Sequence, residues 1–328
     1  MNILITGGAG YVGSVFVDYV LSTPWVLLDN LLKSSVPDIR IKVFDNLMYK
    51  QDGLVGMLGK YKDKLDFIYG DVRDYDSLEE HAEWADVILP LAALVGMPIC
   101  EKDPSGALEI NQNHVCHLAG YCEEKGKKII YPNTNSGYGL GLGSSYCTED
   151  TPLDPISVYG KTKCAAEKSV LYYKGIALRL ATVFGVSPRM RLDLLVNDFT
   201  YKAATDGYVV LFEKDFKRNY IHVRDVAKAF CHMIVNYEKY RGQVFNLGLS
   251  DANLSKWELC LKIKEHVPHF SIQVDEIRKD PDQRNYIVSN EKIEKTGWSP
   301  EYSIDDGIKE LLKAYKIINP VSKKYANA

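Results

Sequence analysis

The sequence predicts an α/β fold, in which a doubly wound parallel sheet is followed by a smaller C-terminal α/β domain. The first observation is at the N-terminus, where an apolar run over 2–6 is followed at once by three regularly spaced glycines and a helical pattern over 14–21. The second is the alternation of apolar runs with amphipathic stretches up to about residue 184, which is typical of a parallel sheet with helices on both faces. A chain of 328 residues is also long enough for two domains.

The three glycines, Gly7, Gly10 and Gly13, have the spacing of a dinucleotide-binding turn. Gly7 allows the tight turn, Gly10 lets the backbone approach a pyrophosphate, and Gly13 lets the helix pack on the strand. The amino terminus of the helix then presents N–H groups and a partial positive charge to the phosphates. An ordinary glycine turn is the alternative, but the strand–turn–helix context favours a Rossmann-type cofactor site that includes Tyr11 and Val12.

A dinucleotide site also needs an acid at the end of the second strand, about 20 residues further on, to hold the adenosine ribose hydroxyls. Asp29 and Asp45 both end apolar runs. We predict Asp45, together with Asn46, because 39–44 alternates like a strand and ends at this acid, and 22–38 is then an insertion. A carboxylate at this position favours NAD over NADP, whose 2′-phosphate it would repel.

The next two strands of the sheet are expected over 65–69 and 87–93. Asp71 and Val72 follow the first of these strands, and Asp71 is placed either to accept from the adenine amino group or to cap the next helix. Leu91 and the small residues Ala92 and Ala93 end the second strand and would let the cofactor lie close to the backbone. The remaining expected elements are strands over 128–131, 177–184 and 209–212 and helices over 192–204, 226–237, 256–266 and 304–318.

Composition excludes several classes of function. The net charge of −3 and the pI of about 6.2 carry no signature of nucleic-acid binding, and the longest apolar stretch, 87–100, is too short for a membrane span. Seven scattered cysteines, without a Cys-x-x-Cys pair or a signal peptide, indicate reduced thiols in the cytoplasm. His114, Cys116 and His117 lie on one expected helix without further ligands nearby in sequence, so we expect no metal.

Tyr159 and Lys163 stand four residues apart near the start of an expected helix, and therefore share one face of it. We expect the lysine charge to favour the phenolate and to lower the tyrosine pKa from about 10 toward neutral pH. Such a tyrosine is suited to take a proton from an alcohol. This spacing alone is common in helices. The glycine turn makes a catalytic role for the pair more convincing, because it implies a cofactor for the oxidation.

Taken in order along the chain, these segments resemble the extended short-chain dehydrogenases, which are NAD-dependent nucleotide-sugar epimerases, dehydratases and reductases. The motifs that carry the resemblance are Gly7-x-x-Gly10-x-x-Gly13, Gly70-Asp71-Val72, Leu91-Ala92-Ala93, Asn133-Thr134-Asn135-Ser136-Gly137-Tyr138-Gly139, Tyr159-x-x-x-Lys163, Arg218–Ala227, Asn246-Leu247-Gly248 and Thr296-Gly297-Trp298-Ser299-Pro300. The resemblance implies an NAD-binding domain over 1–184, to which 217–248 return. It also implies a nucleotide-sugar-binding domain formed by 185–216 and 249–328.

The resemblance also assigns roles at the reacting carbon. Tyr159 would be the acid/base that takes the proton of a sugar hydroxyl, Lys163 would lower the tyrosine pKa and bind the nicotinamide ribose, and Thr134 would hydrogen-bond the same hydroxyl. In the related 4,6-dehydratases this threonine is followed by Asp and Glu, which move protons during water loss. Asn135 and Ser136 occupy those positions here, which disfavours dehydration and leaves both as candidate substrate contacts. Oxidation at a single carbon needs no carboxyl group at these two positions and therefore remains possible.

Arginines supply the expected diphosphate contacts of the substrate. Arg189, Arg218 and Arg284 are candidate clamps, because a guanidinium can bind a phosphate through two parallel hydrogen bonds. Arg191 belongs to the same short motif as Arg189 and is included with them. Thr182 stands where many members of the family carry Asn, so the contact with sugar or phosphate there differs from theirs.

A closer resemblance is to one branch of the family, the GDP-heptose 4-dehydrogenases of bacterial capsule biosynthesis. Its basis is in Asp45–Tyr49, Leu91–Gly96, Tyr131–Gly139 and Arg189–Asp193. The branch oxidises the C4 hydroxyl of GDP-D-glycero-α-D-manno-heptose, which implies a 4-keto product and a role in surface polysaccharide synthesis. The chain resembles this branch least over 22–38.

Two other functions remain open at this point. A nucleotide-sugar 4-epimerase uses the same Tyr159, Lys163 and Thr134 and differs only in reducing the ketone again on its opposite face. A catalytically silent NAD-binding regulator is the second, although such proteins commonly lose the tyrosine or the lysine. The resemblance further implies a homodimer, packed through the helix that carries Tyr159 and the helix near 105–124.

Overall fold

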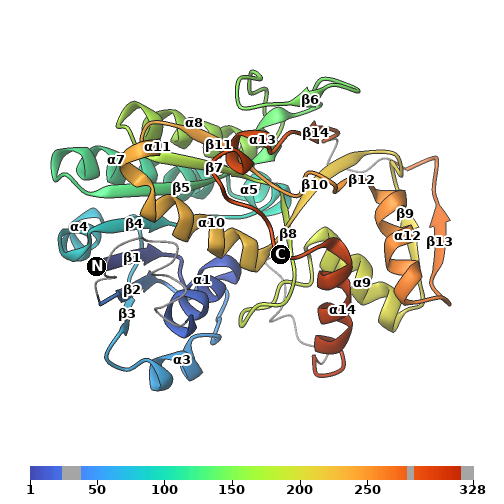
Figure 1. Cartoon of the computed structure of the whole chain (residues 1–328), viewed down its shortest axis with the longest axis horizontal. Coiled ribbons are helices and arrows are strands. Elements are labelled where there is room, and N and C mark those ends of the chain that lie inside the picture. Colours follow the sequence, from blue (N-terminus) through green and yellow to red (C-terminus); the bar gives the residue numbers. More distant parts are fainter. Residues whose placement is uncertain (24–37, 279–283, 319–328) are drawn as a thin grey trace.

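The computed structural model describes residues 1–23, 38–278 and 284–318 (Figure 1). Its centre is a seven-stranded parallel sheet in the order β11-β7-β5-β4-β1-β2-β3. The strands are β1 (Asn2–Thr6), β2 (Arg40–Asp45), β3 (Leu65–Tyr69), β4 (Val87–Pro90), β5 (Lys128–Thr134), β7 (Ile176–Leu180) and β11 (Val244–Leu247). The predicted Rossmann-type fold class is confirmed. The strand order reverses direction at β1 and β4, and ligands of open α/β sheets bind in the crevice that this reversal leaves at the carboxyl ends of the strands.

Helices cover both faces of the sheet: α1 (Tyr11–Ser22) and α10 (Val223–Val235) on one, and α4 (Tyr75–Trp84), α7 (His114–Glu124) and α8 (Val158–Tyr172) on the other. Successive residues of β1 feed opposite cores, because side chains alternate along a strand. Ile3 and Ile5 pack with Phe16 and Phe230 under α1 and α10, whereas Leu4 belongs to the core under α4, α7 and α8. This double burial explains why β1 reads as an unbroken apolar run.

A smaller lobe lies beyond the carboxyl ends of the strands, on the right in Figure 1. Its elements are α9 (Leu195–Thr205), α12 (Lys256–His266), α14 (Ile304–Ala314), the paired strands β9 (Tyr208–Leu211) and β13 (Ser271–Val274), and a three-stranded sheet of β12 (Asn253–Ser255), β10 (Lys217–His222) and β8 (Thr182–Phe184). Val196, Leu259 and Ile308 of this lobe belong to the same continuous core as Phe16 of α1. The two lobes are therefore packed together.

The expected single strand over 177–184 is wrong. It divides at Ala181 into β7, which pairs within the large sheet, and β8, which pairs with β10 of the smaller lobe. The physical reason is that both neighbours of β7 stop there: Leu180 pairs with Thr134 on one side and with Leu247 on the other, and these are the last residues of β5 and β11. The residues that follow, β8, therefore pair with β10 instead.

Other expected elements are present with shifted ends. The fourth strand stops at Pro90 instead of residue 93, α9 starts at Leu195, and α14 ends at Ala314. The expected helix over 226–237 begins earlier, at Val223, and is followed by the short α11 (Tyr237–Tyr240). The remaining short elements are α3 (Val55–Lys60), α5 (Met97–Lys102), α6 (Pro104–Leu108), a π-helix (Glu109–Asn113), a 3₁₀ helix (Asn135–Tyr138), β6 (Tyr146–Cys147), β14 (Ile287–Val288) and α13 (Glu291–Glu294). Within the described ranges, no helix has the length and apolar character that crossing a bilayer requires.

Candidate active site

The glycine turn between β1 and α1 has the shape that a pyrophosphate requires. Gly7 has φ +69°, and a Cβ added to it would lie 2.5 Å from the backbone nitrogen of Ala92. A Cβ on Gly13 would lie 2.6 Å from Gly8 Cα, so helix and turn touch backbone to backbone. In this described part of the chain, α1 has Gly10 as its N-cap residue, without a side-chain cap and without an acidic residue in the first turn. Its N–H groups therefore face outward to an anion, and the turn fits a dinucleotide.

Asp45 ends β2 beside this turn and is almost fully buried. Its carboxylate accepts hydrogen bonds from the backbone nitrogens of Ala9 at 3.0 Å and Leu47 at 2.8 Å, and from Gln51 Nε2 at 3.3 Å. Burial raises the pKa of Asp45, and these hydrogen bonds oppose that rise. The acid is thus held against the glycine turn, as a ribose ligand would be. Asp29, the alternative acid, lies outside the described residues.

Asp71 lies just after β3 and is hydrogen-bonded to Asn46, which directly follows β2. Asn46 Nδ2 donates to Asp71 at 3.1 Å, and Arg73 donates to it through Nε and Nη2 at 2.9 and 2.8 Å. The Arg73 guanidinium holds the Asp71 pKa well below its usual range. Helix α4 is capped by Asp74, so the capping alternative for Asp71 is wrong. Its carboxylate lies on the cavity wall.

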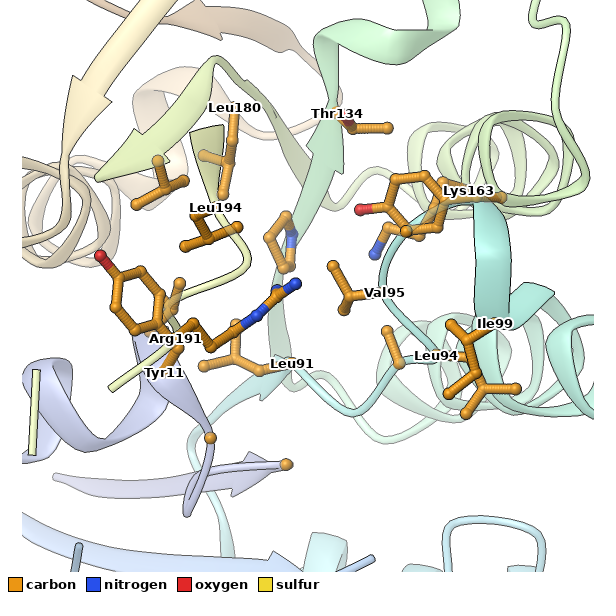
Figure 2. Close-up of a pocket in the computed structure, with 18 of the residues that line it drawn as sticks. Tyr11, Leu91, Leu94, Val95, Ile99, Thr134, Lys163, Leu180, Arg191 and Leu194 are labelled. Carbon is orange, nitrogen blue, oxygen red and sulfur yellow. The ribbon is translucent and has the colours of Figure 1, made fainter. Parts of the chain in front are cut away.

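One cavity of about 630 Å³ lies at the carboxyl ends of the strands and between the lobes. Its walls bring together almost all residues singled out from the sequence: Gly7, Gly10, Tyr11, Val12, Gly13, Asp45, Asn46, Asp71, Val72, Leu91, Ala92, Ala93, Thr134, Ser136, Tyr159, Lys163, Thr182, Arg189, Arg191, Arg218 and Arg284. Asn135 is the exception, because its side chain is buried and does not line the cavity. In Figure 2, Thr134 and Lys163 lie on one side, and Tyr11 and Arg191 enter from the opposite wall.

The start of α8 places the tyrosine and the lysine on the wall of the cavity. Ser157 caps this helix by accepting a hydrogen bond from the Gly160 nitrogen at 3.1 Å. Lys163 is 4% exposed, and its Nζ lies 4.2 Å from the ring centroid of Tyr131 on β5. Thr134, the last residue of β5, lies close enough to Tyr159 for its hydroxyl to lower the tyrosine pKa. Two neighbouring elements thus bring one phenol, one amine and one hydroxyl to the same point.

The predicted fall of the Tyr159 pKa is wrong for this site. Loss of hydration raises the Tyr159 pKa to about 12, and it lowers the Lys163 pKa to about 7. Arg284 and Arg191 oppose the rise at Tyr159, as does the hydrogen bond from Thr134. Sequence spacing predicted that the two groups would be neighbours, but not how strongly burial acts on both of them.

Arg284 and Ser136 continue the polar cluster beyond Thr134. The Thr134 and Ser136 hydroxyls are 2.9 Å apart, and the Ser136 backbone nitrogen donates to Thr134 Oγ1 at 3.1 Å. Arg284 Nη1 donates to Ser136 Oγ. The guanidinium expected to clamp a diphosphate thus lies, in this structure, beside the hydroxyl group nearest to Thr134.

The other predicted arginines lie on different walls. Arg189 packs its guanidinium over the Tyr49 ring, 5.4 Å from the centroid, on the side of Asp45. Arg191 pairs with Asp193 and extends into the cavity. Arg218 packs over a ring as well, 5.6 Å from the centroid of Tyr286.

Three features of the site were missed from the sequence. Asn111, in the π-helix, accepts from the Leu94 nitrogen at 2.8 Å and donates to its carbonyl at 2.9 Å, which fixes the loop along the cavity. Lys256, at the start of α12, lines the cavity and donates to a backbone carbonyl. The third is a buried network below Thr134, in which Glu167 of α8 binds Arg179 of β7. The sign in the sequence that could have revealed these features is the presence of charged residues within apolar runs, because such residues are buried mainly when they are paired.

Glu167 and Arg179 are only 3% and 6% exposed and meet at 2.7 Å. Glu167 also accepts from Asn133, the residue before Thr134, and Arg179 donates to the Tyr138 hydroxyl at 2.9 Å. The network therefore holds both ends of the segment that carries Thr134 and Ser136.

The glycine turn with Asp45 and the tyrosine–lysine pair lie in one cavity of a Rossmann fold. This combination defines an oxidoreductase of the short-chain dehydrogenase class. The chain belongs to the NAD dependent epimerase/dehydratase family, whose model matches residues 3–248. NAD is the cofactor, and the glycine turn and Asp45 fit it. The part of the chain that the structure describes contains no cluster of three or more acidic, histidine or cysteine side chains that could hold a metal ion.

Known proteins from several organisms are similar over nearly the whole chain. The low-salt glycan biosynthesis protein of Haloferax volcanii is 30% identical over 328 residues, covering 96% of this chain and 98% of that protein. Among solved structures, DesIV, a dTDP-glucose 4,6-dehydratase from Streptomyces venezuelae, has a TM-score of 0.82 at 23% identity and covers 97% of both chains. UDP-glucose 4-epimerase from Thermotoga maritima has a TM-score of 0.79 at 23% identity and covers 97% of this chain and 99% of its own.

Proposed function

We propose that this protein is an NAD-dependent 4-dehydrogenase that oxidises the C4 hydroxyl of a nucleotide-linked sugar. The observation that carries the proposal is the convergence of Thr134, Tyr159 and Lys163 in the cavity that also contains the glycine turn. Bound NAD supplies the hydride acceptor. The protein supplies a phenol to take the hydroxyl proton, a hydroxyl group to orient the sugar, and a buried amine to bind the nicotinamide ribose.

The absence of a carboxyl group next to Thr134 favours oxidation over loss of water. Asn135 and Ser136 follow Thr134, and neither can act as a carboxyl acid/base. The side chain of Asn135 is also buried outside the cavity. Relatives named as dehydratases and as epimerases both exist, and the chemistry of these two positions argues against the former reaction for this chain.

GDP-D-glycero-α-D-manno-heptose is the substrate we propose first, in a pathway of capsule or other surface polysaccharide synthesis. The support is the resemblance over Asp45–Tyr49, Leu91–Gly96, Tyr131–Gly139 and Arg189–Asp193, together with the basic residues of the cavity lining. Arg218, Arg284 and Lys256 supply positive charge to the cavity lining, which suits a diphosphate. A 4-epimerase is the second candidate, supported by the same three residues and by the epimerases among the relatives.

The test incubates the NAD-loaded protein with GDP-heptose and then with UDP-, dTDP- and CDP-sugars, with products followed by NMR. We expect a 4-keto product, and a loss of about 10²–10⁴-fold in rate for Tyr159→Phe, which is the contribution of general-base catalysis. Tyr172→Phe is the matched control, because Tyr172 lies on the same helix and is 79% exposed. A C4 epimer without keto product would replace the dehydrogenase with the epimerase. Unchanged turnover in Tyr159→Phe would refute both.

A further inference from the structure

The hydroxyl groups beside Tyr159 form one chain that ends in a guanidinium. Arg284 Nη1 donates to Ser136 Oγ, Ser136 Oγ lies 2.9 Å from Thr134 Oγ1, and the Thr134 hydroxyl acts on Tyr159 by lowering its pKa. Ser136 is 2% exposed, so the middle of this chain is shielded from water. The arrangement uses a position at which related dehydratases are expected to carry an acid.

The direction of the hydrogen bonds follows from which groups can only donate or only accept. A phenolate can only accept, so Thr134 must give its hydroxyl hydrogen to ionised Tyr159. The Thr134 oxygen has two lone pairs, which are taken by the Ser136 backbone nitrogen at 3.1 Å and by the Ser136 hydroxyl. Ser136 then accepts from Arg284, because a guanidinium can only donate. Every donor in the chain therefore points toward the phenolate.

We propose that Ser136 and Arg284 are positioning residues for the base: they complete a hydrogen-bond chain that stabilises the ionised form of Tyr159. This inference rests on the proposed use of Tyr159 as a base. It gives Arg284 a task at the reacting end of the cavity that differs from clamping a diphosphate. It also gives Ser136 a role that alanine or an acid could not fill.

Other charged and titratable groups also act on Tyr159, and the experiment must separate them from the chain. They are Tyr131 of β5, Cys100 of α5 and Arg191 of the segment after β8. Lys163, one turn along the same helix, packs on the Tyr131 ring. None of these is altered in the variants below. Arg284 is the group that most strongly opposes the effect of burial on the Tyr159 pKa.

The test measures ionisation of Tyr159 directly, by NMR of NAD-loaded protein carrying ¹³Cζ-labelled tyrosine. The resonance that disappears in Tyr159→Phe identifies the residue. We expect Ser136→Ala and Arg284→Gln each to raise the Tyr159 pKa by about one unit, which is about tenfold less phenolate at a given pH. Arg218→Gln is the matched control, since it removes a guanidinium from the same cavity without touching the chain. It should leave the titration in place while raising KM.

Two results would overturn the inference. The first is an unchanged Tyr159 titration in both Ser136→Ala and Arg284→Gln. The second is an equal shift in Arg218→Gln, which would show a general electrostatic effect of the basic residues in the cavity instead of an effect of the hydrogen-bond chain. If a nucleotide sugar is turned over, the rise of kcat with pH must move to higher pH in both variants. The size of that move must match the change in the Tyr159 pKa measured by NMR. If none is turned over, the proposed function fails while the titration still decides the inference.

Discussion

Lys163 makes the stability of the cofactor-free protein depend on pH in an unusual direction. Its side chain is buried, and within the described ranges it forms no salt bridge with a carboxylate. Burial lowers its pKa from 10.5 to about 7. Replacing it by Met keeps a long apolar side chain and removes the buried ammonium group.

The sign follows from proton counting. Between pH 7 and pH 10.5 the unfolded chain holds the lysine proton and the folded protein does not, so the free energy of unfolding rises with pH across this window. Below pH 7 the full penalty for burying the ammonium is present. A pKa drop of this size corresponds to about 5 kcal/mol. Lys163→Met is therefore expected to exceed the wild type in stability by up to about 5 kcal/mol at pH 6, with most of the difference gone by pH 10.

Urea unfolding of NAD-free wild type and variant at pH 6, 8 and 10 measures this difference. Lys168→Met is the control, because Lys168 lies on the exposed side of the same helix and its substitution should give a small difference at every pH. A Lys163→Met difference that stays constant from pH 6 to pH 10 would refute the lowered pKa. A variant less stable than the wild type at pH 6 would show that the buried amine makes stabilising contacts instead.

Two further predictions concern the frame of the site. Glu167→Gln leaves the buried Arg179 without its counter-charge and should cost about 3–5 kcal/mol in urea unfolding, while Glu167→Leu with Arg179→Met should recover most of it; a cost below 1 kcal/mol for the single change would contradict the pairing. Gly7→Ala places a Cβ 2.5 Å from the Ala92 nitrogen at a residue with φ +69°, and should weaken NAD binding at least tenfold in calorimetry. Gly56→Ala, where nothing lies within 4 Å, should leave binding unchanged.

The parts of the molecule that the sequence predicted well are those set by local geometry. The glycine turn requires particular backbone angles at Gly7, and a strand buried on both faces must be apolar throughout. Both demands leave a signature within a few residues. The tyrosine and lysine were likewise placed together by helical periodicity alone.

The parts that could not be predicted depend on neighbours distant in sequence. β7 ends and β8 begins because β5 and β11 both end beside Leu180. The sequence of 177–184 does not indicate where those two neighbouring strands end. The Tyr159 pKa depends on how much water the surrounding walls exclude. The bond from Arg284 to Ser136 joins positions 148 residues apart, and neither residue's local sequence indicates the other.

The bonds that tie α1 to the segment after β8 have a consequence for how the protein folds. Tyr11 donates through its hydroxyl to the Gly185 carbonyl at 2.7 Å, and Ser187 donates to the Tyr11 carbonyl at 2.8 Å. The residues that complete the cofactor turn are thus about half a chain length away from it. Closing such a large loop is entropically costly and slow. During synthesis, the first strand and helix must therefore wait for residues beyond 187 to emerge before the NAD site can reach its final shape.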